Sequence, residues 1–273
     1  MRQATGIWLD GVPVGDAWAQ DRGLHYGDGL FETLVLRQGR IRFRELHTAR
    51  LAEGCERLGI RLDAASALPA AERLAGAQDA LLKLIVTRGS AVARGYAPTG
   101  TEIPRQLLLR YALPPAPDAE DAATGVIVLK ATLGENRLLA GMKHLNRLEQ
   151  VLARAEMRDS SAFEGILCSS SGLLACGTMT NLFLVHEGVL RTPRVDRCGI
   201  AGVMRAVVLR EAARAGIPAE QADLLPQALA SAQEIFLTNA RLGVRAVTQL
   251  GERRLPVGPV THELRSRIAS LDA

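Results

Sequence analysis

The chain alternates between short apolar runs, typical of buried strands, and segments with apolar residues at every third or fourth position, typical of helices. The runs predict strands at 6–9, 12–14, 31–36, 40–43, 81–87, 106–112, 125–131 and 234–239, and a hairpin over 164–190. The helical spacing predicts helices at 45–60, 68–78, 145–158, 201–215 and 226–231, and one at the end of the chain. Strands and helices thus alternate in both halves, which predicts an α/β (α+β) fold.

A proline-rich segment interrupts this pattern near the middle of the chain. Pro114, Pro115 and Pro117 fix φ and remove backbone donors, so neither a strand nor a helix can continue through them. The segment predicts two domains: an N-terminal α/β domain at 1–112, a linker at 113–120 and a C-terminal domain at 121–273.

Composition narrows the class of protein. Of the 273 residues, 48% are hydrophobic and 23% charged, which is typical of a globular protein. The sequence has no apolar run of 18 residues and no secretory signal, and its four cysteines are scattered, so we expect a cytoplasmic protein without a membrane segment or disulfides. The basic residues are interleaved with acidic ones, and only 4% of all residues are aromatic. Both observations argue against nucleic-acid binding. Histidines at ligand spacing are lacking, so we expect no metal.

Lys143 stands just before a predicted amphipathic helix, in the segment LLAGMKHLNRLEQVLARAEM. An unprotonated lysine amine can form a Schiff base with a carbonyl, and burial or nearby cations favour that state by lowering its pKa. His144, Arg147 and Arg137 are such cations in the sequence. Periodicity alone favours a different interpretation, a surface lysine in front of an amphipathic helix.

Five blocks of sequence favour the Schiff-base interpretation of Lys143 over the surface interpretation. The string KHLNRLEQVLAR at 143–154 resembles the segment around the cofactor lysine of 4-amino-4-deoxychorismate lyases, members of the class IV aminotransferase family. Further matches to this family, in the same order, are RGLHYGDGLFET (22–33) with the helix at 43–51, TNLFLV (180–185), CGIAGVMR (198–205) and EIFLTNA (234–240). The resemblance implies the two-domain fold of the pyridoxal-phosphate-dependent class IV aminotransferases, with Lys143 as the catalytic residue and the C-terminal domain binding the cofactor.

The resemblance also implies where the cofactor phosphate binds. Arg50 occupies the position of the family's phosphate arginine, and its planar fork suits a phosphate. The residues before the helix at 201–215 offer N–H groups at its positive end. The implied cofactor-binding residues are Arg50, Lys143, Cys176, Asn181, Ile200, Ala201 and Thr238. A surface ion pair for Arg50, and an ordinary helix start at 199–201, are the alternatives.

Cys176 departs from the family pattern. A glutamate normally faces the pyridine nitrogen at this position and keeps it protonated, whereas a thiol is a weak partner and becomes a thiolate only if its pKa falls below about 8.5. Transamination depends strongly on a protonated ring. The lyase reaction depends on it less, because its product becomes aromatic. Cys176 therefore favours a lyase, unless it is simply a small buried strand residue.

Tyr26, Arg94, Tyr96 and Asn239 are the predicted substrate contacts. Arg94 and Tyr96 stand on the glycine-bearing loop at 88–100, which approaches the substrate in such lyases; a solvated turn is the alternative. Tyr26, next to Gly27, is expected to line the cleft, and Asn239 ends the predicted strand at 234–239. The resemblance implies a cytoplasmic homodimer that converts a small molecule, 4-amino-4-deoxychorismate, to 4-aminobenzoate and pyruvate through a pyridoxal 5'-phosphate aldimine, in folate biosynthesis. A D-amino-acid or branched-chain transaminase and a weakly active pyridoxal-phosphate-binding protein remain alternatives.

Overall fold

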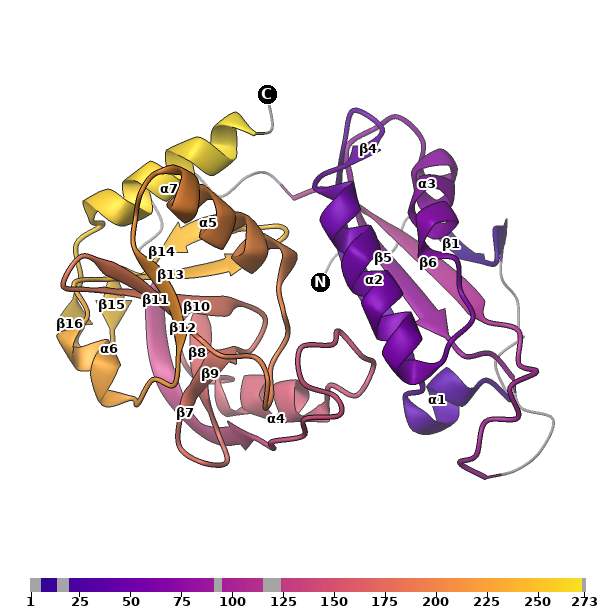
Figure 1. Cartoon of the computed structure of the whole chain (residues 1–273), viewed down its shortest axis with the longest axis horizontal. Helices are drawn as coiled ribbons and strands as arrows, with labels where there is room; N and C mark the ends of the chain where they lie inside the picture. The colour runs from indigo at the N-terminus through magenta and orange to yellow at the C-terminus, as the bar shows by residue number, and fades with distance from the viewer. Residues whose placement is uncertain (1–5, 14–19, 91–94, 115–123, 272–273) are drawn as a thin grey trace. The chain divides into compact units, whose positions relative to one another are not determined.

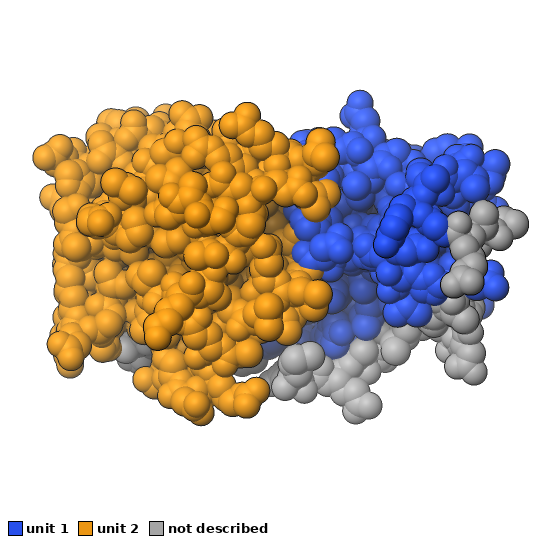
Figure 2. Space-filling model, turned by 90° about the horizontal axis from the view of Figure 1, so that it is seen from below, with its two compact units in different colours: residues 1–115, 142–146 blue, residues 116–141, 147–273 orange. Residues whose placement is uncertain are grey.

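The computed structural model describes residues 6–13, 20–90, 95–114 and 124–271, which form three sheets with helices packed on them (Figure 1). Contacts divide the chain into two compact units, coloured separately in Figure 2. Unit 1 comprises Met1–Pro115 and Met142–Asn146, and unit 2 comprises Ala116–Gly141 and Arg147–Ala273. The five residues around Lys143 therefore belong with the N-terminal part of the chain. The mixed α/β architecture confirms the predicted fold class.

Unit 1 is built on one antiparallel sheet with the strand order β2-β1-β6-β5-β3-β4. The strands are β1 (Gly6–Leu9), β2 (Val12–Pro13), β3 (Gly29–Arg37), β4 (Arg40–Ile41), β5 (Ala80–Thr87) and β6 (Arg105–Ala112). The helices α2 (Arg44–Leu58) and α3 (Ala64–Ala75) pack on this sheet, and the core between them contains Leu34, Leu51, Leu68 and Leu82, each at most 1% exposed.

Successive residues of β3 point to opposite faces of the sheet, as strand geometry requires. Glu32 and Leu34 are buried, whereas Phe31 and Thr33 are half-buried. The segment Met142–Asn146 extends the sheet along the free edge of β3: the Phe31 N–H donates to the carbonyl oxygen of Lys143 (2.9 Å). This pairing fixes the backbone of Lys143 beside Phe31.

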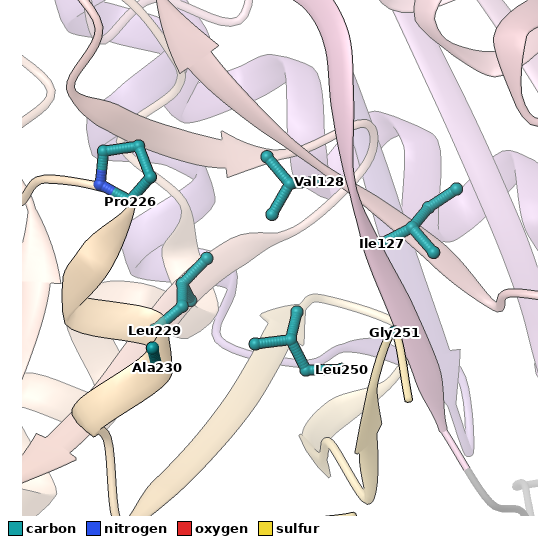
Figure 3. A pocket seen from close by; sticks show the side chains of 7 residues that line it. All are labelled: Ile127, Val128, Pro226, Leu229, Ala230, Leu250 and Gly251. Carbon is teal, nitrogen blue, oxygen red and sulfur yellow. The ribbon is translucent and has the colours of Figure 1, made fainter. Parts of the chain in front are cut away.

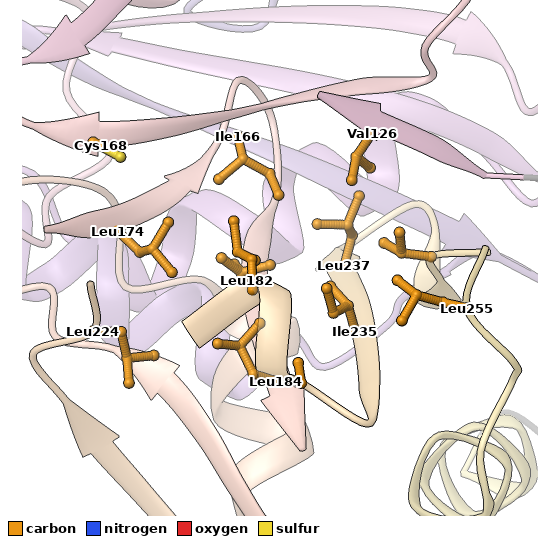
Figure 4. Packing of buried hydrophobic residues seen from close by; sticks show 13 residues of the cluster. Val126, Ile166, Cys168, Leu174, Leu182, Leu184, Leu224, Ile235, Leu237 and Leu255 are labelled. Carbon is orange, nitrogen blue, oxygen red and sulfur yellow. The ribbon is translucent and has the colours of Figure 1, made fainter. Parts of the chain in front are cut away.

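Unit 2 contains two five-stranded sheets. One has the order β12-β11-β10-β13-β14 and the other β16-β15-β7-β8-β9. Their bounds are β7 (Gly125–Leu133), β8 (Glu164–Ser169), β9 (Leu174–Gly177), β10 (Asn181–His186), β11 (Val189–Pro193), β12 (Ala219–Ala222), β13 (Glu234–Asn239), β14 (Gly243–Ala246), β15 (Gln249–Leu250) and β16 (Arg253–Arg254). Side chains from both sheets form one core, which includes Val126, Ile166, Leu182 and Leu237 (Figure 4).

Four helices are described in unit 2. They are α4 (Leu148–Glu156), α5 (Val203–Arg214), α6 (Gln227–Ser231) and α7 (Pro259–Ser270). The helices α5 and α7 contact each other and β13 (Figure 1). The helix α4 lies on β7 and β8, where Ala153 and Met157 pack against Leu129 and Leu167.

Two helices begin three or more residues away from the predicted start. The predicted helix at 145–158 begins only at Leu148, because the Leu145 N–H donates to the Gly29 carbonyl oxygen (3.0 Å) and holds this stretch on unit 1. The helix predicted from 68 begins earlier, at Ala64, since the side chain of Asp63 accepts a hydrogen bond from the Ala65 N–H (3.0 Å) and caps the helix.

Two further local predictions were wrong near the N-terminus. Phe43, predicted as the last residue of a strand, has a φ of 51° and precedes the first residue of α2. A short helix, α1 (Arg22–Tyr26), occupies residues for which we predicted no element. The Asp21 side chain caps its start and Gly27, with a φ of 64°, ends it.

Among the residues described, no helix combines the length and apolar composition that a bilayer crossing requires.

Candidate active site

Two adjacent residues of β3 position the two cationic groups that the sequence singled out in unit 1. Phe31 lies under Lys143, whose Nζ is 4.1 Å from the centroid of the aromatic ring. Glu32, on the opposite face of the strand, binds Arg50. The Nζ of Lys83 is 5.2 Å from the same Phe31 ring, so two ammonium groups share one aromatic side chain.

The Glu32 carboxylate holds Arg50 and His47 in one buried cluster. Glu32 and His47 are each 1% exposed. The Arg50 Nε donates to Glu32 Oε1 (2.8 Å) and its Nη2 to Oε2 (2.5 Å), while His47 Nδ1 lies 2.7 Å from Oε2. This bidentate pair fixes the plane of the guanidinium. Arg50 and His47 are both on α2, three residues apart, so helical spacing brings both side chains to Glu32.

The charge of this cluster is set by its cations. Burial by itself raises the pKa of Glu32, but the charge of Arg50 and the hydrogen bond and charge of His47 outweigh burial and lower that pKa to about 2. Glu32 is therefore ionised throughout the neutral range. Arg50 is oriented by a fixed negative charge and remains cationic.

In unit 2 the loop at 199–202 leads into α5. The Asn181 Nδ2 donates to the carbonyl oxygen of Ile200 (2.9 Å), and a Cβ on Gly202 would lie 2.0 Å from Asn181 Oδ1. A larger residue at position 202 would therefore have to displace the Asn181 amide; Gly202 precedes the first turn of α5 without a side-chain cap. The Ala201 N–H donates to the Gly141 carbonyl oxygen (2.9 Å) and is therefore already occupied within the protein.

Thr238 lies directly opposite Asn181 in the pairing of β13 with β10. It is fully buried, and within the described part of the chain its Oγ1 has no hydrogen-bond partner. A buried hydroxyl of this kind costs free energy unless a ligand satisfies it. Its neighbour Asn239 is engaged in a turn, where its Oδ1 accepts from the N–H groups of Arg241 (3.0 Å) and Leu242 (2.8 Å). Thr238 thus fits the cofactor phosphate expected from the sequence.

Replacing Thr238 by valine separates cofactor binding from folding. Valine has nearly the same shape and removes the hydroxyl, so we expect the free energy of unfolding of the cofactor-free protein to stay unchanged or to rise. We expect the affinity for pyridoxal phosphate to fall about tenfold, the equivalent of one lost hydrogen bond to a charged group. Denaturant unfolding and a cofactor titration followed by absorbance measure the two effects. An unchanged affinity would contradict the role of Thr238.

Cys176 lies in β9 and is 6% exposed. It belongs to the apolar cluster of Leu129, Ala153 and Met157, against which Cys198 also packs. Burial, with smaller contributions from Cys198 and Glu164, raises the pKa of the Cys176 thiol to about 12. Cys176 is therefore a neutral thiol, and the structure gives no support to a thiolate that would replace the family's glutamate.

Glu164 is not available in its place. Its Oε1 accepts from the Thr178 hydroxyl (2.5 Å) and its Oε2 from the Met179 N–H and the Thr180 hydroxyl (both 3.1 Å). Both oxygens therefore hold the turn between β9 and β10. The charge of Arg147 does act on Cys176. Near Cys176 there are thus a cation, Arg147, and a carboxylate, Glu164, whose oxygens are already hydrogen-bonded within the protein.

Exchanging Cys176 for glutamate tests its part in reaction choice. We expect conversion of the bound cofactor to its amine form by D-alanine or a branched-chain amino acid to accelerate about tenfold, a change of roughly 1.4 kcal/mol in the barrier. We expect the lyase rate to change less, since aromatisation already drives that reaction. A large gain in the lyase rate would show instead that electron withdrawal by the ring limits it. The matched control is Cys176→Ser, which keeps the size of the side chain and adds no carboxylate.

The predicted substrate contacts are only partly brought together. The rings of Tyr26 and Tyr96 lie 5.3 Å apart between centroids, whereas Asn239 is in unit 2 and Arg94 lies outside the described residues. Arg88, in the same loop, is buried and donates to Asp28 and to the carbonyl oxygens of Leu58 and Gly59. Its donors hold the protein together and are not directed at a ligand.

A pocket of about 300 Å³ in unit 2 has no such chemistry. Figure 3 shows that its lining is apolar: Ile127, Val128, Pro226, Leu229, Ala230, Leu250 and Gly251. Without titratable or hydrogen-bonding side chains it cannot position a reacting group. In the described ranges there is also no group of three or more His, Cys, Asp or Glu side chains suited to a metal ion.

Unit 1 thus presents a lysine amine and an arginine fixed by a buried carboxylate, and unit 2 presents a helix start beside a buried hydroxyl. Each of these groups suits one part of a phosphorylated carbonyl cofactor. The family model of amino-transferase class IV matches residues 29–250. The chain belongs to this family, and its predicted fold is confirmed.

Relatives within the family differ in activity. The chain is 30% identical to the aminodeoxychorismate lyase of Vibrio harveyi, over 96% of this chain and 99% of that protein. The crystal structure of 4-amino-4-deoxychorismate lyase from Pseudomonas aeruginosa is 43% identical, covers 97% of this chain and 98% of its own, and superposes with a TM-score of 0.91. The branched-chain aminotransferase of Escherichia coli is 20% identical with a TM-score of 0.86, which shows the shared fold alone.

Proposed function

We propose that the chain is a pyridoxal-phosphate-dependent lyase that converts 4-amino-4-deoxychorismate to 4-aminobenzoate and pyruvate, a step of folate biosynthesis. The observation that supports it most is the pairing of Lys143 and Arg50 with neighbouring residues of β3, in a chain 43% identical to a lyase of that name over nearly its whole length. The buried hydroxyl of Thr238, which has no partner among the described residues, supports the proposal that the chain binds this cofactor, and does so independently of the sequence similarity.

The roles of the residues follow from their chemistry. In unit 1, Arg50, held in place by Glu32, is the proposed cation for the cofactor phosphate. In unit 2, Thr238 and the N–H groups at the start of α5 are donors of the kind that a phosphate accepts. When bound, pyridoxal phosphate supplies an aldehyde that bonds to amines and a ring that accepts electrons from them. Lys143 Nζ would hold that aldehyde, and its free amine would act as the general base that takes the proton from the substrate ring carbon.

Cys176 favours the lyase over a transaminase. A neutral thiol in an apolar cluster does not stabilise a protonated pyridine ring, which transamination requires more than the lyase reaction does. The branched-chain and D-alanine aminotransferases among the relatives keep the alternative open, since they share 24–28% identity with the chain over at least 90% of its length.

The test is an assay of the purified, cofactor-loaded protein with 4-amino-4-deoxychorismate. We expect 4-aminobenzoate and pyruvate to form in equal amounts, measured by fluorescence and by coupling to lactate dehydrogenase. Stable conversion of the cofactor to its amine form by D-alanine or a branched-chain amino acid, without lyase turnover, would identify a transaminase. A cofactor spectrum without turnover of any substrate would identify a binding protein.

We also propose that the chain acts as a cytoplasmic homodimer, as the family resemblance implies. One surface of α4 supports a partner: Leu148, Val151 and Leu152, at helical spacing, are 76%, 60% and 66% exposed. Contiguous exposed apolar side chains mark interaction surfaces in soluble proteins. Light scattering should give twice the mass of the 29.3 kDa chain, and a mass of one chain would contradict the proposal.

A further inference from the structure

A buried arginine in unit 1 joins two segments that are more than seventy residues apart in the sequence. Arg22, the first residue of α1, is 4% exposed. Its Nη1 donates to the carbonyl oxygen of Gly95 (3.1 Å), and its Nη2 to that of Tyr96 (2.6 Å). Its Nε donates to Asp28 (2.8 Å). One planar side chain with five donors therefore holds the loop at 95–96 against α1.

The loop is shaped to make this contact. Gly95 has a φ of 115°, a conformation that favours glycine, although a Cβ there would meet no atom within 4 Å. Glycine is thus required for the backbone path and not for space. That path turns two successive carbonyl oxygens toward the same guanidinium. Because the Tyr96 side chain is 83% exposed, its position depends on this backbone anchor far more than on packing.

The same arginine contacts the aromatic partner of Tyr96. The Cζ of Arg22 lies 4.9 Å from the centroid of the Tyr26 ring, which is 5.3 Å from the Tyr96 ring and tilted by 59° to it. Asp28, which accepts from Arg22, also accepts from Arg88 Nε (2.7 Å). Arg88 in turn donates to the carbonyl oxygens at the end of α2, the helix that carries Arg50. The contact is therefore tied to the helix that carries the proposed phosphate arginine.

We propose that Arg22 is a positioning residue for substrate binding, which holds the Tyr96 ring beside Tyr26 as a two-ring surface for the unsaturated six-membered ring of the substrate. This proposal rests on the proposed function above. Aromatic side chains contact planar rings through their faces and edges with defined geometry. Arg22 itself need not touch the substrate, since it acts through the backbone of Tyr96.

Fluorine NMR tests the contact without any substrate. The chain has three tyrosines (Tyr26, Tyr96 and Tyr111), so uniform labelling with 3-fluorotyrosine gives three resonances, which single Tyr→Phe variants assign. In Arg22→Lys, one ammonium group replaces the fork, and we expect the Tyr96 resonance to move to the position of a solvated tyrosine while that of Tyr111 stays. Gly95→Ala disturbs the same contact from the loop and should give the same shift, even if Arg22→Lys folds poorly.

Steady-state kinetics test the substrate role. We expect Gly95→Ala and Arg22→Lys to raise KM for 4-amino-4-deoxychorismate about tenfold with kcat within about twofold, the signature of lost uniform binding. The absorbance of the bound cofactor in Gly95→Ala should match that of the wild type. The double variant Arg22→Lys/Tyr96→Ala should be no worse than Tyr96→Ala, because both changes remove one contact.

Each negative result has a separate meaning. An unmoved Tyr96 resonance in both variants would overturn the contact itself. A shifted resonance with an unchanged KM would overturn the role in substrate binding. Absence of lyase turnover in the wild type would overturn the proposed function and the substrate role with it, whereas the contact would still be judged by the fluorine spectra.

Discussion

Lys143→Ala should abolish turnover, with kcat falling by about a thousandfold or more, because both the bond to the cofactor and the general base are lost. The absorbance of the lysine-bound cofactor should disappear with it. In the wild type, borohydride reduction should fix the cofactor permanently to one lysine. The chain has three lysines, so peptide mass spectrometry can place the added mass on Lys143, Lys83 or Lys130 without ambiguity.

Lys83→Ala is the matched control for this experiment. Lys83 lies over the same Phe31 ring, with its Nζ 5.2 Å from the centroid compared with 4.1 Å for Lys143. The two variants therefore remove one ammonium group each from the same surroundings. We expect borohydride to label Lys83→Ala like the wild type. Labelling of Lys83 or Lys130 in the wild type would show that Lys143 is not the cofactor lysine.

Glu32→Gln should lower the free energy of unfolding by about 3 kcal/mol, within the range found when one partner of a buried ion pair is removed. In the wild type the Glu32 oxygens contact the guanidinium of Arg50 and Nδ1 of His47. The amide therefore leaves the charge of Arg50 without its buried carboxylate. Arg50 also loses the bidentate contact that orients it, so we expect weaker binding of pyridoxal phosphate. Urea unfolding of the cofactor-free protein and a cofactor titration measure these two effects.

The difference in the free energy of unfolding between the wild type and Glu32→Gln should depend on pH, which provides a second test. The Glu32 pKa is about 2 in the folded chain and 4.5 ordinarily, so its ionised form contributes stability above about pH 4.5. That contribution is lost as the pH falls through the folded pKa. The gap between wild type and Glu32→Gln should thus be constant near neutrality and should narrow from about pH 4.5 toward pH 2.

Glu53→Gln is the matched control on α2. Glu53 is 65% exposed and pairs with Arg57 one turn along the helix, at 3.6 Å. Exposed pairs of this kind contribute about 0–1 kcal/mol, so the variant should unfold close to the wild type at every pH. An equal loss of stability in Glu32→Gln and Glu53→Gln would contradict the special position of Glu32.

The sequence predicted most of the elements of the fold, whereas several of their boundaries depend on the tertiary structure. The alternation of apolar runs with helical spacing was enough to predict most strands and helices, because burial of one face imposes a period that survives in the sequence. Boundaries were wrong where a contact distant in sequence decided them, as at Leu145, whose N–H pairs with Gly29. The helix α1 was not predicted, because a five-residue helix is too short to show a period.

The sequence by itself determined the family and the fold class, and it predicts Lys143, Arg50 and Cys176 as site residues because they stand in motifs whose spacing is local. Only the tertiary structure decided that 142–146 pairs with β3, that Glu32 and His47 orient Arg50, and that Cys176 is a buried neutral thiol. The physical reason is that orientation, burial and pKa depend on neighbours brought together by folding. Arg22 and the carbonyl oxygens of residues 95 and 96 show this most clearly, because a backbone acceptor leaves no trace in the sequence.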